Sequence, residues 1–146
     1  MKIHFRDIGT LVGQEFGVSD WVEITQERVN QFAEATGDHQ WIHVDVERAT
    51  REIGGTIAHG FLTVSLITGL NTLEIEGLGR VINYGADNLR FTNMLRVGKR
   101  VRVRQKMLSA DAKAGGVMLR CECTVDIEGE TRPACVVETL LILYGA

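Results

Sequence analysis

The chain has 146 residues, of which 45% are hydrophobic and 24% charged, with a formal net charge of −3 at pH 7. This length suits one domain with a sizeable core, and the slightly acidic balance argues against nucleic acid or a membrane surface as the main partner. No apolar run approaches the roughly 20 residues of a membrane helix, and the first residues lack the pattern of a signal peptide. We therefore expect a single cytoplasmic domain over residues 1–146.

Two helices with clear end signals are predicted in the first half of the chain. Thr25 is a good N-cap for a helix that begins at Gln26, and Gly37 stands where that helix would stop. Asp45 is a second N-cap, and the short helix that follows it is expected to end at Gly54.

A third helix is predicted to begin at Gly60 and to run toward Leu73. Its apolar residues lie on nearly every side and are Phe61, Leu62, Val64, Leu66, Ile67, Leu70 and Leu73. A helix that is apolar all round is a buried helix, so another layer of structure is expected to wrap around it.

The second half of the chain alternates apolar and polar residues, which is typical of antiparallel strands with one face on a core. Strands are predicted near 81–83 and 89–91, on either side of a turn at 85–88, and then over 101–107, 117–127 and 134–143, with a hairpin turn at Gly129-Glu130. No long crossover helix separates these strands, so a parallel sheet is not expected. The predicted fold class is α+β, an antiparallel β-sheet wrapped around a buried central α-helix.

The three cysteines are Cys121, Cys123 and Cys135. Cys121 and Cys123 share one face of a predicted strand and are poorly placed to bridge each other. Without a pair of histidines nearby they also make a poor zinc site. We expect reduced, buried thiols and no metal site.

Asp38 and His43 stand close together in the segment Gly37-Asp38-His39-Gln40-Trp41-Ile42-His43. Adding water to a double bond conjugated to a thioester needs a base, an acid and a donor for the enolate oxygen. A carboxylate and an imidazole around one water supply the first two. Gly60, at the first turn of the buried helix, offers a backbone N–H as the third. On spacing alone, the alternative is that Asp38 is a helix cap and His43 an ordinary surface or core histidine.

A wider pattern bears on that choice. The segment Phe32-Ala33-Glu34-Ala35-Thr36-Gly37-Asp38-His39-Gln40-Trp41-Ile42-His43-Val44-Asp45, followed by Ala49 and by Ile57-Ala58-His59-Gly60-Phe61-Leu62, resembles the MaoC-like dehydratases, which include the (R)-specific enoyl-CoA hydratases. The Gln-Trp-Ile-His variant is similar to the branch related to nodulation protein N. The resemblance continues through Tyr84-Gly85, Leu89-Arg90-Phe91 and Val97-Gly98, so it covers most of the chain. It implies a single domain with a hotdog fold.

The resemblance implies that Asp38 and His43 are the catalytic, water-activating dyad and that Gly60 supplies the oxyanion-binding amide. The hydratase pattern usually has Asn-Pro where this chain has Gln40-Trp41, which puts the shape of the acyl pocket in question. Further candidates for substrate binding are Gln40, Trp41, His59, Phe61 and Arg90. For His59, the alternative is a structural tie to nearby backbone.

Seven lysines and arginines, and no acidic residue, lie between Arg90 and Lys106. Nucleic-acid binding would also need interleaved aromatics, and only Phe91 is present. The stretch is therefore either a solvated strand face or, through Arg90, Arg96 or Lys99, a site that attracts the phosphates of coenzyme A or an acidic acyl carrier protein. Coenzyme A would enter as part of the substrate, and no separate cofactor is expected.

The predicted function is that of an (R)-specific enoyl-CoA hydratase, which adds water to trans-2-enoyl thioesters or dehydrates (R)-3-hydroxyacyl thioesters. A hotdog acyl-CoA thioesterase and a non-catalytic acyl-thioester-binding subunit are the alternatives. The last predicted strand is apolar on both faces and would leave an exposed patch on a monomer, so we expect a homodimer.

Overall fold

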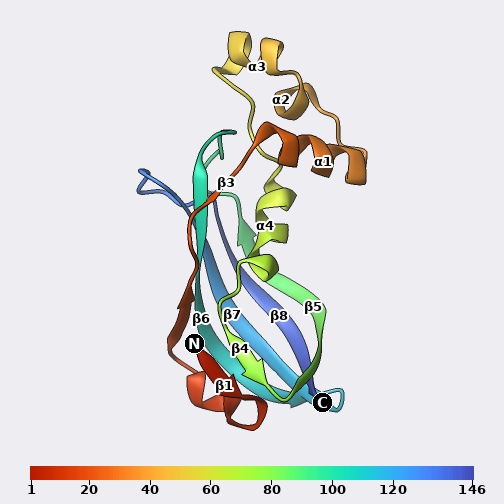
Figure 1. Cartoon of the computed structure of the whole chain (residues 1–146), viewed down its shortest axis with the longest axis vertical. Coiled ribbons are helices and arrows are strands. Elements are labelled where there is room, and N and C mark those ends of the chain that lie inside the picture. Colours follow the sequence, from red (N-terminus) through yellow and green to blue (C-terminus); the bar gives the residue numbers. More distant parts are fainter.

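A curved six-stranded sheet dominates the computed structural model, which describes residues 1–146 (Figure 1). Its strands are β2 (Glu15–Val18), β3 (Val22–Glu23), β5 (Leu78–Arg90), β6 (Arg100–Lys113), β7 (Gly116–Ile127) and β8 (Cys135–Gly145). They lie in the order β2-β6-β7-β8-β5, β3 also pairs with β6, and every pairing is antiparallel. The short parallel pair β1 (Lys2–His4) and β4 (Glu74–Glu76) lies near one end with the 3₁₀ helix η1 (Phe5–Leu11).

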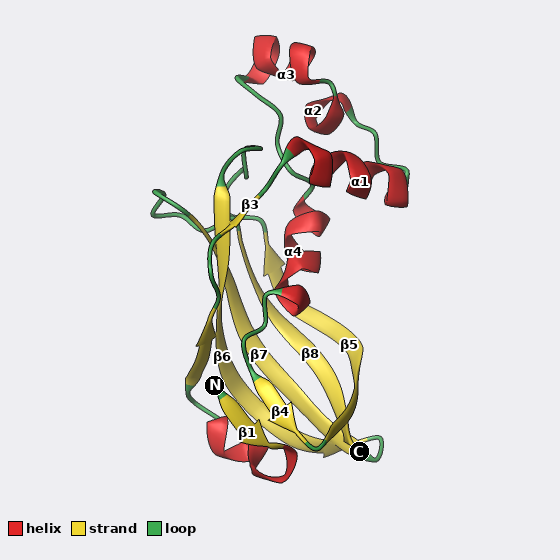
Figure 2. Ribbon diagram, viewed as in Figure 1, coloured by secondary structure: helices red, strands yellow, loops and turns green.

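The helices gather toward the other end of the molecule (Figure 2). They are α1 (Gln26–Thr36), α2 (Trp41–Val44), α3 (Val46–Ile53) and α4 (Gly60–Gly69). Thr25 caps α1 by accepting from the Arg28 amide at 3.1 Å, and Asp45 caps α3 in the same way from the Arg48 amide at 3.0 Å. The helix limits predicted from these caps are confirmed, whereas the single turn α2 carries no such signal.

Helix α4 packs lengthwise against the sheet, as predicted for the central helix, but it ends at Gly69 rather than near Leu73. Leu62 and Ile67 are buried against the core, whereas Phe61 is 65% exposed. The predicted arrangement of an antiparallel sheet wrapped around a central helix is confirmed, but α4 is buried on one side only in the single chain. The sheet covers one side of the helix, and α1 to α3 lie beyond its N-terminal end rather than over its open side (Figure 2).

Strand β5 runs without interruption through the turn that was predicted at 85–88. It pairs with β8 from Leu78 opposite Gly145 to Arg90 opposite Val136, and three register shifts absorb the irregular residues. One of these residues, Asn88, has a φ of 54°. The turn-forming residues thus produce β-bulges, because a long neighbouring strand satisfies the backbone hydrogen bonds that a turn would have broken.

The core lies between the sheet and α4, and the alternating residues of β6 and β7 fill it as predicted. All three cysteines are buried and free. Burial raises the pKa of the Cys121 and Cys135 thiols to about 12. None of the helices has the length and apolarity that a membrane span requires.

Candidate active site

Asp38 lies in the link segment, residues 37–40, which joins α1 to α2. Its exposed side chain accepts a hydrogen bond from the Gln40 amide to Oδ1 at 3.3 Å, and its own amide donates to Thr36 Oγ1 at 3.3 Å. Its carbonyl oxygen lies 3.0 Å from His59 Nε2. The side chain is thus exposed, while two hydrogen bonds, from its amide and to its carbonyl, hold the backbone that carries it.

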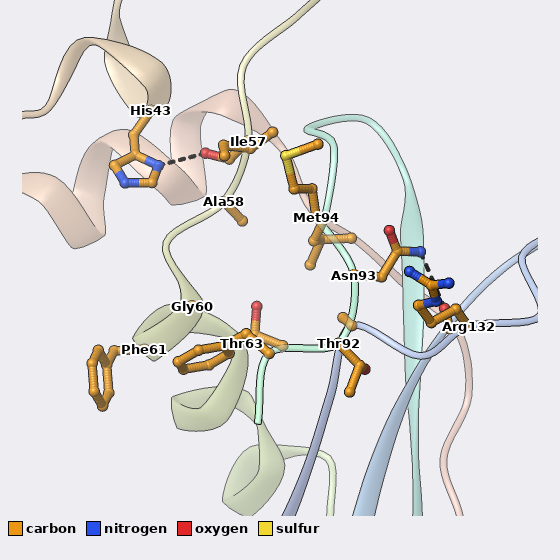
Figure 3. A pocket seen from close by; sticks show the side chains of 13 residues that line it. His43, Ile57, Ala58, Gly60, Phe61, Thr63, Thr92, Asn93, Met94 and Arg132 are labelled. Atoms are coloured by element: carbon orange, nitrogen blue, oxygen red, sulfur yellow. Dashed lines mark hydrogen bonds between the residues drawn. The ribbon is translucent and has the colours of Figure 1, made fainter. Parts of the chain in front are cut away.

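His43 lies in α2 and is only 6% exposed. Its Nδ1 is 2.7 Å from the Ile57 carbonyl oxygen (Figure 3). Because a carbonyl oxygen can only accept, Nδ1 carries the hydrogen and Nε2 is left with a free lone pair. The His43 carbonyl accepts from Gln26 Nε2 at 2.7 Å, and Gln26 Oε1 accepts from Thr56 Oγ1 at 2.6 Å, so α2 is tied to the strand-like segment that leads to α4.

Three side chains converge where these segments meet. The rings of His43 and His59 stack with their centroids 3.8 Å apart and their planes 23° apart. A carboxylate oxygen of Asp38 and one ring nitrogen each of His43 and His59 all lie within 4.8 Å of one another. The structure therefore brings Asp38 and His43 together. The same three side chains are also the chain's one cluster of potential metal ligands, and the absence of a metal site stays a prediction.

A pocket of about 500 Å³ opens beside His43 (Figure 3). Its lining includes Gly60 and Phe61, both predicted from the sequence, and the complete set is His43, Ile57, Ala58, Gly60, Phe61, Thr63, Phe91, Thr92, Asn93, Met94, Leu95, Arg132 and Ala134. A Cβ at Gly60 would lie 2.8 Å from the Phe91 ring, so a larger residue there would have to displace that side chain. No side chain caps α4. The backbone N–H groups of its first turn, which borders the pocket at Gly60, therefore have no side-chain acceptor.

The chain that carries this site is similar to known proteins over most of its length. Residues 7–121 match the family described as MaoC like domain. The 3-hydroxyacyl-thioester dehydratase Z of Mycobacterium tuberculosis is 45% identical over an alignment of 139 positions that covers 92% of each chain. The Nodulation protein N of Rhizobium meliloti is 40% identical over an alignment of 149 positions, gaps included, that covers 97% of this chain and 91% of that protein.

The chain belongs to the MaoC-like dehydratase family. The resemblance inferred from the sequence, including the branch related to nodulation protein N, is confirmed. The R-hydratase PhaJ1 of Pseudomonas aeruginosa, in its unliganded form, has a TM-score of 0.74 with this chain at 23% identity, covering 92% of this chain and 83% of that one. This likeness confirms the predicted hotdog fold.

Four of the predicted substrate-binding residues of this MaoC-like domain do not line the pocket, namely Gln40, Trp41, His59 and Arg90. The indole of Trp41 packs against the Arg48 guanidinium, whose carbon is 4.1 Å from the ring centroid. Arg90 turns back to donate to the Leu89 carbonyl at 2.7 Å. Trp41, whose bulk suggested an altered acyl pocket, therefore occupies space between α2 and α3.

The pocket of this family member also contains polar residues that sequence reasoning missed. Thr92 and Asn93 follow β5, and Arg132 comes from the loop between β7 and β8. Asn93 Nδ2 donates to the Arg132 carbonyl at 3.2 Å, which fixes that loop beside the pocket. Arg132 lies outside the basic stretch at 90–106, so the charge pattern gave no signal for it.

The basic stretch itself is largely occupied by contacts within the protein. Arg96 donates to the Gly55 carbonyl at 2.8 Å, while Arg102 and Arg104 both donate to Asp126. These contacts favour the solvated strand face among the two interpretations of that stretch.

Proposed function

We propose that this protein is a hydro-lyase that adds water to trans-2-enoyl thioesters, or removes it from (R)-3-hydroxyacyl thioesters, with Asp38 and His43 as the water-activating dyad. The observation that carries the proposal is the proximity of the Asp38 carboxylate to the ring of His43, whose Nδ1 is already engaged. His43 and Gly60 line the same pocket, and Asp38 lies outside its lining. The name of the Mycobacterium tuberculosis relative, which matches 92% of each chain, supports the same chemistry.

The reaction needs one water held between the two dyad residues. The carboxylate of Asp38 and Nε2 of His43 are both acceptors, so each accepts a hydrogen bond from one hydrogen of that water, and only one of these hydrogens is transferred as a proton when the water attacks. Attack of the water oxygen on the β carbon moves the electron pair of the double bond toward the thioester oxygen. The proton taken from the water then goes to the α carbon, so that one hydroxyl and one hydrogen are added and the dyad is regenerated.

The thioester oxygen gains negative charge during this step. We place it against the backbone amide of Gly60, where the N-terminus of α4 favours an anion. The thioester arm then leaves along the pocket, whose opposite side carries Arg132, the only permanently charged side chain in its lining (Figure 3). The phosphates of coenzyme A or of a carrier-bound arm would suit this cation. Coenzyme A acts as part of the substrate, without a separate cofactor.

The assembly that fits this proposal is a cytoplasmic homodimer. Strand β5 lies at the edge of the sheet, and its Val81, Ile82 and Tyr84 are exposed apolar residues. A second copy would cover that edge and the open side of α4 together. Three buried, unbridged thiols are in keeping with a reducing compartment.

Incubation with crotonyl-CoA tests the reaction directly. Hydration removes the absorbance of the conjugated double bond and releases no thiol, so a thiol reagent added to the same reaction should stay silent. Release of free coenzyme A would instead indicate a thioesterase. No change with any enoyl-CoA or carrier-bound enoyl substrate would contradict the hydro-lyase and favour a non-catalytic binding subunit.

A further inference from the structure

His59 is a buried side chain that contacts both members of the dyad. It is 3% exposed, its Nε2 lies 3.0 Å from the Asp38 carbonyl oxygen, and its ring stacks on that of His43 at 3.8 Å. The next residue in the chain is Gly60, at the start of α4. His59 therefore connects the three parts of the site although it does not line the pocket.

The hydrogen bond to Asp38 matters because the link segment has few other ties. Its remaining hydrogen bonds join it only to residues between 33 and 43: Gly37 N to Ala33 O, Asp38 N to Thr36 Oγ1, Gln40 N to Asp38 Oδ1 and His43 N to Gln40 O. The bond from His59 is the only hydrogen bond from a distant part of the chain. Without it, the exposed segment that carries Asp38 could shift relative to α4.

The hydrogen-bond partners of His59 also define its tautomer. Since the Asp38 carbonyl can only accept, Nε2 carries the hydrogen. The other nitrogen, Nδ1, is buried and has no partner, so a hydrogen placed there would be an unsatisfied buried donor. The ring thus presents a donor to Asp38 and a flat face to His43, and Phe32 backs it at 4.8 Å between ring centroids.

We infer that His59 is the positioning residue of the dyad. Its Nε2–H fixes the backbone of Asp38 to the N-terminal end of α4, and its ring limits the tilt of the His43 imidazole. The inference rests on the proposed hydro-lyase function and adds a residue to it. Because small errors in placement of catalytic groups are costly, the hydrogen bond should act on the chemical step rather than on substrate binding.

A pair of substitutions of similar length isolates the hydrogen bond. His59→Gln keeps an amide donor near the position of Nε2, whereas His59→Met fills the space without a donor. We expect kcat for crotonyl-CoA hydration to fall by about 10- to 100-fold in His59→Met, with KM changed less than about twofold, and to stay within about fivefold of wild type in His59→Gln. His39→Gln is the matched control, because His39 adjoins Asp38 but is exposed and faces Glu34; its kcat should not change.

Backbone ¹⁵N relaxation of residues 38–40 provides a readout that does not depend on activity. Order parameters should be lower in His59→Met than in wild type and restored in His59→Gln. Equal kcat in His59→Gln and His59→Met, or an unaltered link segment in both, would overturn the inference. If His59→Met does not fold, the inference is tested by comparing His59→Gln with wild type in kcat and in the order parameters of residues 38–40. Absence of hydration by wild type would refute the proposed function instead, and the relaxation data would still test the positioning role.

Discussion

Asp38 and His43 occupy contrasting environments, and this contrast has consequences for mutation. His43 is buried and bonded through its ring and its backbone, so replacing it would disturb packing as well as chemistry. The side chain of Asp38 is exposed, and its contact within the protein is an oxygen that accepts from the Gln40 amide. An asparagine at position 38 could keep that contact and lose only the negative charge. Position 38 therefore offers the cleaner separation of catalysis from stability.

We predict that Asp38→Asn lowers kcat for hydration by about 10²- to 10⁴-fold, because the carboxylate no longer accepts a proton from water. Its free energy of unfolding should stay within about 0.5 kcal/mol of wild type. Steady-state kinetics with crotonyl-CoA and urea denaturation measure the two quantities. Asp45→Asn is the matched control, since Asp45 also accepts from a backbone amide and asparagine is an equally good cap. Near-normal turnover in Asp38→Asn would show that the dyad is misassigned.

At the scale of the elements, the outer face of β6 and β7 carries a small charge network. Asp126 on β7 accepts from Arg102 Nε at 3.2 Å and from Arg104 Nε at 2.7 Å. Partial burial by itself would raise the pKa of the Asp126 carboxyl, but the hydrogen bonds from Arg104 and Arg102 outweigh it and hold that pKa below its ordinary value near 3.8. The ionised form is thus favoured by folding, and the pair stabilises the two strands at neutral pH.

We predict that Asp126→Asn lowers the free energy of unfolding by about 1 kcal/mol near neutral pH. Because the folded-state pKa is depressed, this contribution is present above the ordinary carboxyl value and is lost as the pH falls through the folded-state pKa. Urea denaturation of wild type and variant should therefore differ at about pH 7 and converge at about pH 2. Asp20→Asn, at an exposed aspartate without an ion pair, should match wild type throughout. A difference that persists in acid would mean that the aspartate acts through packing.

The elements that the sequence predicts are those with local signals. Thr25, Gly37 and Asp45 cap helices through contacts within four residues, so reading them needs no knowledge of the fold. The bulges of β5 depend on pairing with β8, some fifty residues away. The turn-forming residues at 85–88 therefore led to the wrong prediction of a turn. Asp38 and His43 were predicted as a pair because both residues lie in one short motif, and the structure brings their side chains together. Two features of the site depend on how separate segments of the chain meet, which the sequence does not display. They are the stacking of His59 on His43 and the place of Arg132 in the pocket lining.

On the scale of the whole molecule, one face is left incomplete. A groove of about 680 Å³ lies between α4 and β5, and its lining is mainly apolar, including Val64, Ile67, Val81 and Leu141. The free edge of β5 runs alongside, with unpaired backbone groups over a strand of 13 residues. Long exposed edges pair readily with other strands, so proteins usually cover or blunt them. An interface between two copies of the chain would account for both features.

We predict that the protein is a dimer in solution and that Ile82→Lys weakens the dimer by placing a charge on the β5 edge. Ile82 is 47% exposed in the single chain. Light scattering across a dilution series should give twice the chain mass for wild type and a shift toward the single-chain mass for the variant. Val12→Lys, at a residue 43% exposed beside η1, should leave the dimer intact. A wild-type protein with the mass of one chain would exclude this assembly.

The burial of all three thiols makes this chain a convenient background for site-specific labelling. Thiol reagents attack the thiolate, and the raised pKa values of Cys121 and Cys135 leave almost none of it at neutral pH, while the fold shields both sulfurs from solvent. A single cysteine introduced at an exposed position would then carry a fluorophore alone, without removal of the native residues. Placed in the link segment at position 39, such a probe would report movement beside Asp38 as substrate enters.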